Sequence, residues 1–346
     1  MMFMKIGLLT GGGDCSGLNA AIRAVVRSAI QKGDRVFGIQ DGWKGFLEGK
    51  NVPLTLEKTS GILPLGGTIL GSARVNPLKV RGGIEKCLRH FRRLKLDVLI
   101  SVGGEGTLRI ASVFSQKGMP IICIPKTIDN DTWGTDYTVG FDTAVQIATD
   151  AIDRLHTTAE SHRRVMIVEV MGRHAGWIAT FSGIAGGADA ILIPEEVFEI
   201  KELCRIIRKR SRRGRKFSIF VVSEDARIRL SNGRILKTPL KKDEYGDVKL
   251  GGIGELLGRE LQKKTGSEVR VTVLGHIQRG GSPTAFDRVL ATRLGVAAVD
   301  LAHQKRFGVI AGIDGMRIRV LPIQEAARKL KTVIPEFSQI GRIFFG

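Results

Sequence analysis

Short apolar runs recur along the chain, and each leads into a glycine-rich stretch and then into apolar residues at helical spacing. Repeated strands, tight turns and amphipathic helices are typical of an α/β protein with a mostly parallel sheet. We expect strands at residues 5–10, 98–102, 165–170 and 270–274. Glycine-rich stretches follow them at residues 11–17, 103–107, 171–177 and 275–281. Helices are then predicted over residues 18–30 and from the second stretch to about residue 115.

Two further segments complete this pattern. Apolar positions within residues 141–155 keep the three-and-four spacing of one helix face and predict a single long helix. Residues 226–266 are polar, charged and interrupted by glycines, so we interpret them as a surface insertion. That insertion is expected to end in a helix over about residues 253–264.

The segment after the apolar run 121–124 places reactive side chains at the end of a predicted strand. Asp129 and Asp131 offer two carboxylates, Thr127 a hydroxyl and Lys126 an ammonium group. In a phosphoryl transfer, one carboxylate can accept the proton of the attacking hydroxyl while the other helps to hold a metal ion. An Asx-rich turn that only ends the strand is the alternative interpretation.

Two glycine clusters lie where helices are predicted to begin. In residues 11–17 and 103–107, glycines let the backbone approach a phosphate without interference from a Cβ atom. The first cluster matches neither the P-loop nor the spaced dinucleotide fingerprint. The second cluster also carries Glu105, a carboxylate that can bind Mg²⁺. Two such loops on one sheet favour a phosphorylated ligand.

Arginines supply the positive charge that a migrating phosphoryl group requires. Arg74 and Arg173 are the candidates for that role. Further cations near strand ends can clamp a second, non-reacting phosphate, because guanidinium groups match phosphate oxygens. These are Arg164, Arg270, His276 and Arg279. Each arginine is alternatively a surface salt-bridge residue, and His276 is alternatively a structural histidine bonded to backbone.

Composition narrows the class of protein. The 346 residues suffice for about two domains, and no apolar run approaches the ~18 residues that span a bilayer. Four cysteines lie far apart without a C-x-x-C pair, so neither a zinc site nor a disulfide framework is indicated. We expect a cytoplasmic protein without a membrane or targeting segment.

The formal charge of +20 suggests nucleic-acid binding, because Lys and Arg neutralise phosphates. No helix-turn-helix, zinc-finger or aromatic RNA-binding signature accompanies that charge. The densest basic run, residues 208–216, follows apolar residues at helical spacing and is expected to be the solvated end of an amphipathic helix. Nucleic-acid binding is therefore disfavoured, and a polyanionic small substrate would also exploit the charge.

Six ordered segments resemble those of the 6-phosphofructokinase family: residues 11–19, 66–74, 125–131, 134–141, 168–176 and 272–283. The resemblance runs from residue 5 to about residue 300, and the remaining residues match only loosely. It implies transfer of a phosphoryl group to the 1-hydroxyl of fructose 6-phosphate, with Mg²⁺ required. It also implies two similar Rossmann-like α/β domains with mostly parallel sheets and an active site in the cleft between them.

The resemblance gives boundaries and an assembly. A nucleotide-binding domain is expected to comprise residues 1–140 and 278–328, and a sugar-phosphate-binding domain residues 141–277 and 329–346. The chain is expected to form a homodimer or homotetramer in which Arg164 and Arg270 reach in from a neighbouring subunit.

Roles for single residues also follow from the resemblance. Asp129 is the base that takes the proton of the sugar hydroxyl, while Thr127, Arg173 and Arg74 steady the transferred group. Glu105 and Asp131 belong to the Mg²⁺ site. ATP is bound by Gly13, Arg74, Val75, Gly104, Glu105, Gly106 and Thr107. Fructose 6-phosphate is bound by Thr127, Ile128, Asp129, Arg164, Met171, Gly172, Arg173, Glu224, Arg270, His276, Ile277, Gln278 and Arg279.

Two positions bear on the phosphoryl donor. Pyrophosphate-using relatives resemble G-G-x-D at residues 103–106, and their aspartate crowds and repels the nucleotide's α-phosphate. Gly106 leaves space and no charge there, which favours ATP. Lys126 favours the opposite, because strict ATP enzymes of the bacterial glycolytic type usually have glycine there, and pyrophosphate enzymes have lysine. We expect an ATP enzyme of a mixed-donor branch, with a pyrophosphate-dependent phosphotransferase as the alternative.

A nicotinamide-dependent oxidoreductase is a rival from another enzyme class, because it also places glycine loops on a parallel sheet. The chain lacks the G-x-G-x-x-G spacing and the downstream ribose-binding acid that such enzymes need. The sequence therefore disfavours this rival.

Overall fold

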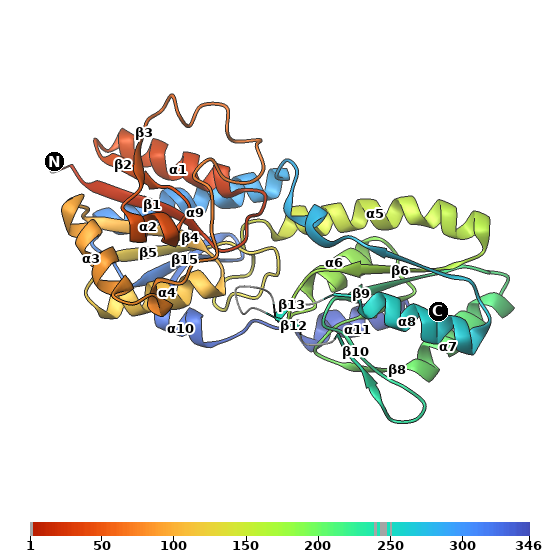
Figure 1. Cartoon of the computed structure of the whole chain (residues 1–346). Helices are drawn as coiled ribbons and strands as arrows, with labels where there is room; N and C mark the ends of the chain where they lie inside the picture. Colours follow the sequence, from red (N-terminus) through yellow and green to blue (C-terminus); the bar gives the residue numbers. More distant parts are fainter. Residues whose placement is uncertain (1–2, 239–240, 243–247, 250) are drawn as a thin grey trace. The chain divides into compact units, whose positions relative to one another are not determined.

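The computed structural model describes residues 3–238, 241–242, 248–249 and 251–346, which fold into two compact units (Figure 1). Unit 1 comprises Met1–Ile128, Thr132–Thr143 and Arg279–Lys331. Unit 2 comprises Asp129–Asp131, Ala144–Gln278 and Thr332–Gly346. Both units combine helices with mostly parallel sheets, so the predicted α/β class is confirmed. Asp129–Asp131 group with unit 2, whereas the expected boundaries put them in the first domain.

The sheet of unit 1 has the strand order β16-β15-β5-β4-β1-β2-β3, parallel at its centre and antiparallel at both edges. Its central strands are apolar on both faces because helices cover both faces, and β4 is buried at every position. The strands are β1 (Lys5–Gly11), β2 (Arg35–Ile39), β3 (Asn51–Leu54), β4 (Val98–Gly103), β5 (Ile121–Pro125), β15 (Val309–Asp314) and β16 (Arg317–Pro322).

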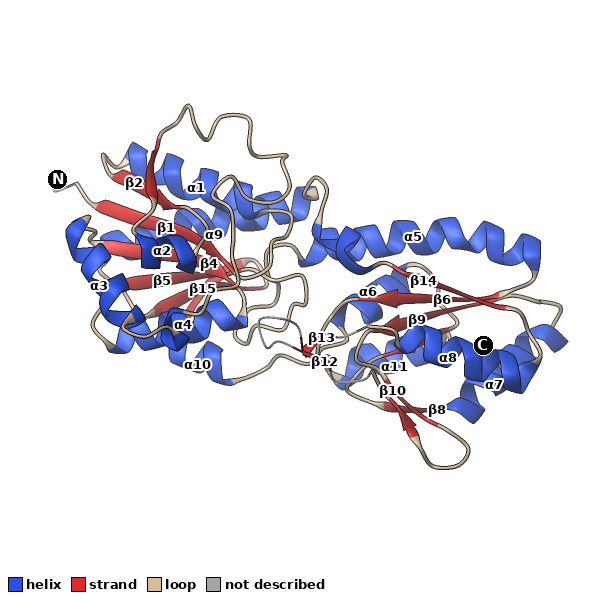
Figure 2. Cartoon of the chain, in the orientation of Figure 1, coloured by secondary structure: helices blue, strands red, loops and turns tan. Residues whose placement is uncertain are grey.

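Helices α1 and α9 pack together on one face of this sheet, and α4 packs with α10 on the other (Figure 2). On the second face Trp43 stacks on Phe114, with 5.4 Å between ring centroids. The helices of unit 1 are α1 (Leu18–Gln31), α2 (Trp43–Glu48), α3 (Gly83–Arg93), α4 (Glu105–Gln116), α9 (Ala285–His303) and α10 (Ile323–Arg328), with the 3₁₀ turn η1 (Pro77–Lys79).

The main sheet of unit 2 has the strand order β14-β6-β9-β7, with parallel neighbours throughout. Helix α8 packs against β14 and β6, and α6 and α11 pack against β7. The strands of this sheet are β6 (Val165–Val170), β7 (Ala190–Leu192), β9 (Ser218–Ser223) and β14 (Val269–Val273). The helices are α6 (Trp177–Ala185), α7 (Ile200–Arg212), α8 (Ile253–Thr265) and α11 (Pro335–Ile343), with the 3₁₀ turn η2 (Gly275–Arg279).

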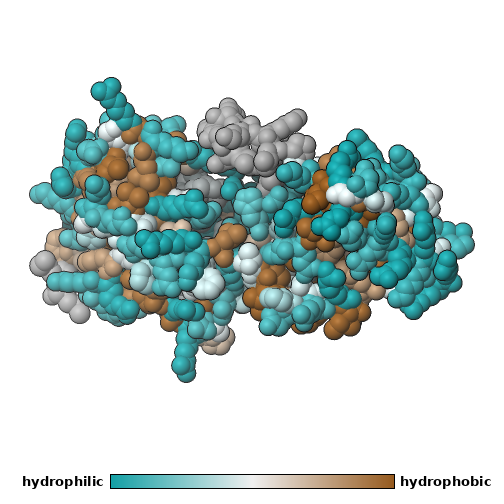
Figure 3. Space-filling view, turned by 90° about the horizontal axis from the view of Figure 1, so that it is seen from below, coloured by the Kyte–Doolittle hydropathy of each residue, from teal (hydrophilic) through white to brown (hydrophobic). Residues whose placement is uncertain are grey.

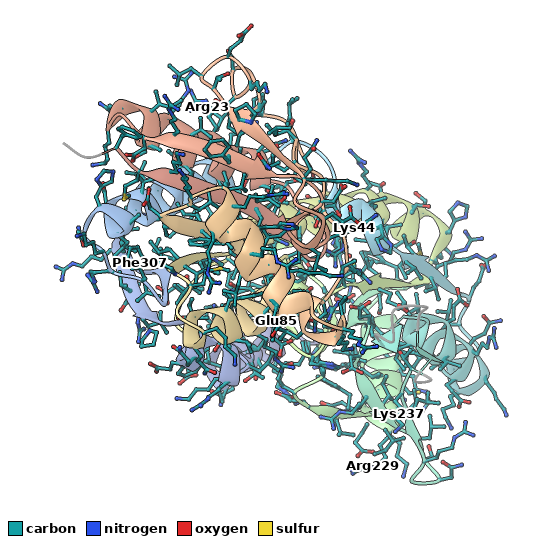
Figure 4. The ribbon with its side chains drawn as sticks, turned by 60° about the vertical axis from the view of Figure 1, so that its left-hand side comes forward. Arg23, Lys44, Glu85, Arg229, Lys237 and Phe307 are labelled. Carbon is teal, nitrogen blue, oxygen red and sulfur yellow. The ribbon has the colours of Figure 1, made fainter. Side chains whose placement is uncertain are left out.

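The predicted insertion is only partly a surface segment. It does end in α8, but β10 (Arg227–Arg229) pairs with β8 (Val197–Glu199) and β11 (Ile235–Leu236) in a small sheet of its own. Arg229 and Lys237 mark this hairpin in Figure 4. Ile228 is fully buried, so the interpretation of this segment as a surface insertion is wrong at β10. The one inward-facing residue of the strand lies between two exposed arginines, which obscured it in the sequence. Residues 239–240, 243–247 and 250 lie outside the described residues. The pair β12 (Lys241–Lys242) and β13 (Val248–Lys249) is antiparallel.

Buried carboxylates fix two helix starts, and a threonine hydroxyl caps a third. Asp287 accepts hydrogen bonds from the backbone N–H groups of Gly140 (2.8 Å) and Thr143 (2.9 Å), where the long helix α5 (Phe141–His162) begins. Thr284 caps α9 by accepting the N–H of Asp287 at 3.2 Å. In unit 2, Glu169 accepts from Gly252 and Gly254, both at 2.7 Å, at the start of α8. These carboxylates satisfy N–H groups that a helix leaves without intrahelical partners.

The face drawn in Figure 3 is largely hydrophilic. No helix among the described residues combines the length and apolarity needed to cross a membrane. The basic end of α7 is exposed as predicted, with one exception. Arg210 turns inward and pairs with the buried Asp189 at 2.6 Å, because that carboxylate also accepts the Ile219 N–H and requires a cation.

Candidate active site

The first glycine loop follows β1 and is held by hydrogen bonds within unit 1. Ser72 Oγ donates to the carbonyl of Gly12, and Thr10 Oγ1 donates to the carbonyl of Gly71 at 2.9 Å. These bonds place the segment that carries Arg74 and Val75 beside the loop. Arg74 is exposed and Val75 is half-buried, so both have surface available to a ligand.

The ammonium group of Lys126 lies inside unit 1. Lys126 is 3% exposed, and its Nζ donates to the carbonyls of Gly11 (3.1 Å) and Gly13. Such a buried cation is stabilised by the carbonyl dipoles and in turn fixes the loop. On the other side of the loop, the guanidinium of Arg279 donates to the carbonyl of Asp14 at 3.1 Å.

The second glycine loop, residues 103–107, joins β4 to α4. A Cβ atom at Gly103 would lie 2.5 Å from Thr107, so packing requires glycine there. Gly104 is less tightly packed, with 3.2 Å from such an atom to the nearest neighbour. At Gly106 an added Cβ would meet no heavy atom within 4 Å, and the backbone there is not left-handed. Glu105, the first residue of α4, pairs with Arg109 one turn later.

Two carboxylates follow β5 at buried positions. Asp129 is 4% exposed and Asp131 is 8% exposed. Asn130 between them has a φ of 50°, in the left-handed region that Asn tolerates better than most residues. Asp129 Oδ2 lies 3.8 Å from Nε of Arg173 within unit 2. Thr127, just before these residues, is half-buried, and its carbonyl accepts the Thr138 hydroxyl at 2.6 Å in unit 1.

Arg173 belongs to the turn after β6, and Glu224 after β9 contacts that turn. Because β6 and β9 are adjacent parallel strands, their carboxyl ends meet. The N–H of Arg173 donates to Glu224 Oε1 at 3.0 Å, and the nearby N–H of Gly172 also favours the ionised carboxylate. Burial, together with the negative charge of Asp129, outweighs these hydrogen bonds and raises the pKa of Glu224 to about 7.

Two of the arginines expected at the sugar phosphate lie elsewhere in unit 2. Arg164 immediately precedes β6 and Arg270 is the second residue of β14, so both lie at the amino ends of these strands. Both guanidinium groups pair with Glu268, at 2.8 and 2.5 Å. Both therefore lie at the edge of the parallel sheet opposite to the turn that carries Arg173, and their expected role in a neighbouring subunit's site stays a prediction.

The remaining sugar-phosphate candidates lie on η2. His276 and Ile277 are exposed, which disfavours a buried structural role for the histidine. Gln278 is buried, and its Oε1 accepts the Met171 N–H at 3.0 Å. Arg279 groups with unit 1, whereas the preceding residues of η2 belong to unit 2.

Glu105 and Asp131, the expected Mg²⁺ residues, belong to unit 1 and unit 2, respectively. Among the described residues, no three or more His, Cys, Asp or Glu side chains are arranged to hold a metal ion. Mg²⁺ usually keeps several waters and binds through one or two carboxylates plus substrate phosphates. The chemistry of these two carboxylates fits that mode.

Two contacts at this site were not predicted from the sequence. One is the bond from Lys126 to the first glycine loop, and the other is the bond from Met171 to Gln278. Each joins groups more than 100 residues apart, and no local pattern of residue types signals such a pair.

A family model described as Phosphofructokinase matches residues 5–302. The chain belongs to this family. Two phosphofructokinase relatives come from Streptomyces coelicolor and cover nearly the whole chain. Its pyrophosphate–fructose 6-phosphate 1-phosphotransferase is 53% identical over 99% of this chain and 100% of that protein. Its ATP-dependent 6-phosphofructokinase 3 is 50% identical over 95% of this chain and 96% of that protein. The two names specify different phosphoryl donors, pyrophosphate and ATP.

Solved structures agree with the family assignment. The phosphofructokinase of Saccharomyces cerevisiae superposes with a TM-score of 0.82 at 32% sequence identity over 94% of this chain. The present chain spans 45% of that yeast chain.

Proposed function

We propose that the chain transfers the γ-phosphoryl group of ATP to the 1-hydroxyl of fructose 6-phosphate, giving fructose 1,6-bisphosphate, in the cytoplasm. Membership of the phosphofructokinase family supports the reaction, but relatives of both donor types are similarly close. The observation that carries the choice of ATP is the open space beside Gly106. A carboxylate at that position would bring a negative charge toward the nucleotide's α-phosphate, and glycine does not.

Asp129 and Arg173 are proposed to carry out the transfer step. Asp129 accepts the proton of the sugar hydroxyl, and Arg173 compensates the negative charge of the migrating phosphoryl group. Their separation of 3.8 Å supports a shared role. Thr127 and Arg74 are proposed to assist Arg173.

The two glycine loops are proposed to bind the donor. Loop 11–13 is fixed by Lys126, and loop 103–107 begins α4, whose first N–H groups attract phosphate oxygens. Glu105 and Asp131 would hold Mg²⁺. Glu105 would then release its ion pair with Arg109 and bind the metal instead. Bound there, Mg²⁺ would neutralise charge on the donor's phosphates.

Binding of the sugar 6-phosphate is proposed to involve a second copy of the chain. Arg164 and Arg270 lie at the strand ends opposite to those near Glu224, so they cannot join that residue within one unit 2. Their pairing with the half-exposed Glu268 supports a role at a subunit boundary, where another chain's site can recruit them. His276 and Arg279 are proposed to complete the phosphate site.

A pyrophosphate-dependent phosphotransferase is the second candidate, and Lys126 is the observation that favours it. Pyrophosphate needs compact positive charge near the first glycine loop, and the Lys126 ammonium group lies there. Its bonds to two loop carbonyls, however, give it a role with either donor.

A donor comparison tests the proposal directly. The purified chain is assayed with fructose 6-phosphate and Mg²⁺, and with either ATP or pyrophosphate, while fructose 1,6-bisphosphate is measured. We expect kcat/KM to be at least ~10-fold higher with ATP, because Gly106 adds no repulsion. A higher value with pyrophosphate would overturn the choice of donor, and absence of product with both donors would overturn the reaction. Reactions without Mg²⁺ serve as the control and should show no transfer.

A further inference from the structure

Two backbone N–H groups after β6 donate to side chains from two other parts of unit 2. Gln278 Oε1 accepts from Met171, and the Glu224 carboxylate accepts from Arg173, both at 3.0 Å. Gln278 is 1% exposed and Glu224 is 9% exposed. Residues 171–173, called the sugar turn below, are therefore held from the inside by buried acceptors.

The backbone of the sugar turn needs such support. Gly172 has a φ of 146° and Arg173 a φ of 50°, both in the region that residues with a Cβ atom rarely adopt. A bond from the Ala175 N–H to the Gly172 carbonyl, at 3.0 Å, closes the turn. The unusual backbone directs the Arg173 guanidinium toward Asp129.

The amide of Gln278 is oriented for this purpose. Met171 N–H is a donor, so the atom that faces it must be the carbonyl oxygen. The Nε2 group is buried and has no hydrogen-bond partner among the described residues. A methionine would fill similar space without burying an unmet donor, so the bond from the oxygen to Met171 is what the amide contributes.

We propose that Gln278 is a positioning residue that acts on the substrate through the sugar turn and does not contact the sugar itself. It holds the backbone of Met171 and thereby keeps Arg173 directed at Asp129. This inference deepens the proposed function and rests on it for its catalytic consequence. The hydrogen bond on which it depends can be measured without any reaction.

The first experiment measures backbone amide hydrogen exchange, residue by residue, in the ligand-free protein. In Gln278→Met, exchange at Met171 should become at least ~10-fold faster, because one hydrogen bond is lost. Gln278→Glu keeps an acceptor oxygen and should keep the protection. Gln262→Met, on the exposed side of α8, is the matched control and should change nothing at Met171. Unchanged protection of Met171 in Gln278→Met would overturn the proposal.

The second experiment is a double-mutant cycle with Arg173→Ala, assayed with fructose 6-phosphate. Alone, Gln278→Met should lower kcat about 10-fold with a smaller change in KM, because it misdirects Arg173. In the Arg173→Ala background, Gln278→Met should lower kcat less than about 3-fold, because the side chain that it misdirects is already absent. An undiminished loss of kcat in that background would mean that Gln278 contacts the substrate directly, and it would overturn the proposal. An inactive wild-type chain would instead reject the proposed function, and the exchange experiment would still decide the role of Gln278 in the turn.

Discussion

The glycine loop 103–107 and the sugar turn 171–173 follow central parallel strands of their respective units, but they are held very differently. In the loop, a Cβ atom added at Gly106 meets nothing within 4 Å. In the turn, Gly172 has a left-handed φ, and an added Cβ would lie 2.6 Å from the carbonyl oxygen of Ala175. The fold requires glycine in the turn and does not require it at Gly106.

This difference separates two kinds of experiment. A substitution at Gly106 leaves the backbone and packing unchanged, so its effects report on the ligand. A substitution at Gly172 changes the backbone that directs Arg173, so its effects report on stability and activity together. The predictions below test whether the turn serves Asp129 and whether the loop serves the donor.

The largest effect is expected for Asp129→Asn, which keeps the shape of the side chain and removes the base. If the turn directs Arg173 toward a reacting carboxylate, kcat should fall about 1,000-fold while KM for fructose 6-phosphate changes little. Steady-state kinetics with both donors would measure this. A kcat within 10-fold of wild type would separate Asp129 from the proton transfer and leave the turn without its proposed partner.

Gly172→Ala is expected to lower activity less than Asp129→Asn does, but to lower stability as well. Alanine at this φ and this distance from Ala175 must shift the turn, at a cost of about 1–3 kcal/mol in unfolding free energy. We expect kcat/KM for fructose 6-phosphate to fall about 100-fold as Arg173 moves. Gly106→Ala is the matched control, and its unfolding free energy should stay within about 0.5 kcal/mol of wild type. Equal destabilisation of the two variants in chemical denaturation would contradict the comparison.

At the open loop, Gly106→Asp should act on the donor alone. Repulsion between the new carboxylate and the α-phosphate should lower kcat/KM for ATP about 30-fold. The melting temperature should not fall, because an acid in the first turn of α4 is favourable. Gly106→Asn separates charge from size and should retain most ATP activity. Unchanged ATP kinetics in Gly106→Asp would refute the role of this position in donor choice.

Sequence patterns predicted the strands and helices well because their signals are local. The apolar run Val165–Val170 forms β6 with the predicted bounds, and α5 begins at Phe141 as predicted. The capping pattern from Thr284 to Asp287 could also have located the start of α9. Strand β10 was not predicted because its one buried residue, Ile228, lies between two arginines in a segment that is polar overall.

The site was predictable in its residue types and less so in its geometry. A joint role for Asp129 and Arg173 was implied by the family resemblance alone, because the strands that precede them, β5 and β6, belong to different sheets. The amino-end positions of Arg164 and Arg270 follow from the predicted strands 165–170 and 270–274, whereas the pairing of both with Glu268 has no local signal. The bonds that Lys126 and Gln278 make depend on long-range packing and have no local signal.

The smallest effect is expected from the charge of Glu224, which tests a single acceptor of the turn. Because its pKa is raised to about 7, the carboxylate form that accepts the Arg173 N–H most strongly dominates only above that pH. The kcat/KM for fructose 6-phosphate should therefore rise with pH through about 7. Glu224→Gln should lack this limb and should be about 10-fold less active than wild type at pH 8, because one acceptor oxygen is lost.

Stability should change in the opposite direction over the same interval. The folded protein binds the Glu224 proton up to a pH of about 7, whereas the unfolded chain releases it near the ordinary value of 4.5. The contribution of Glu224 to the unfolding free energy is therefore fully present below 4.5 and is lost as the pH rises to 7, by at most roughly 3 kcal/mol. Denaturation at pH 5 and pH 8 should show the wild type losing stability relative to Glu224→Gln. If stability rose with pH as activity does, a proton on Glu224 would not stabilise the folded protein, and the turn would be held by some other group.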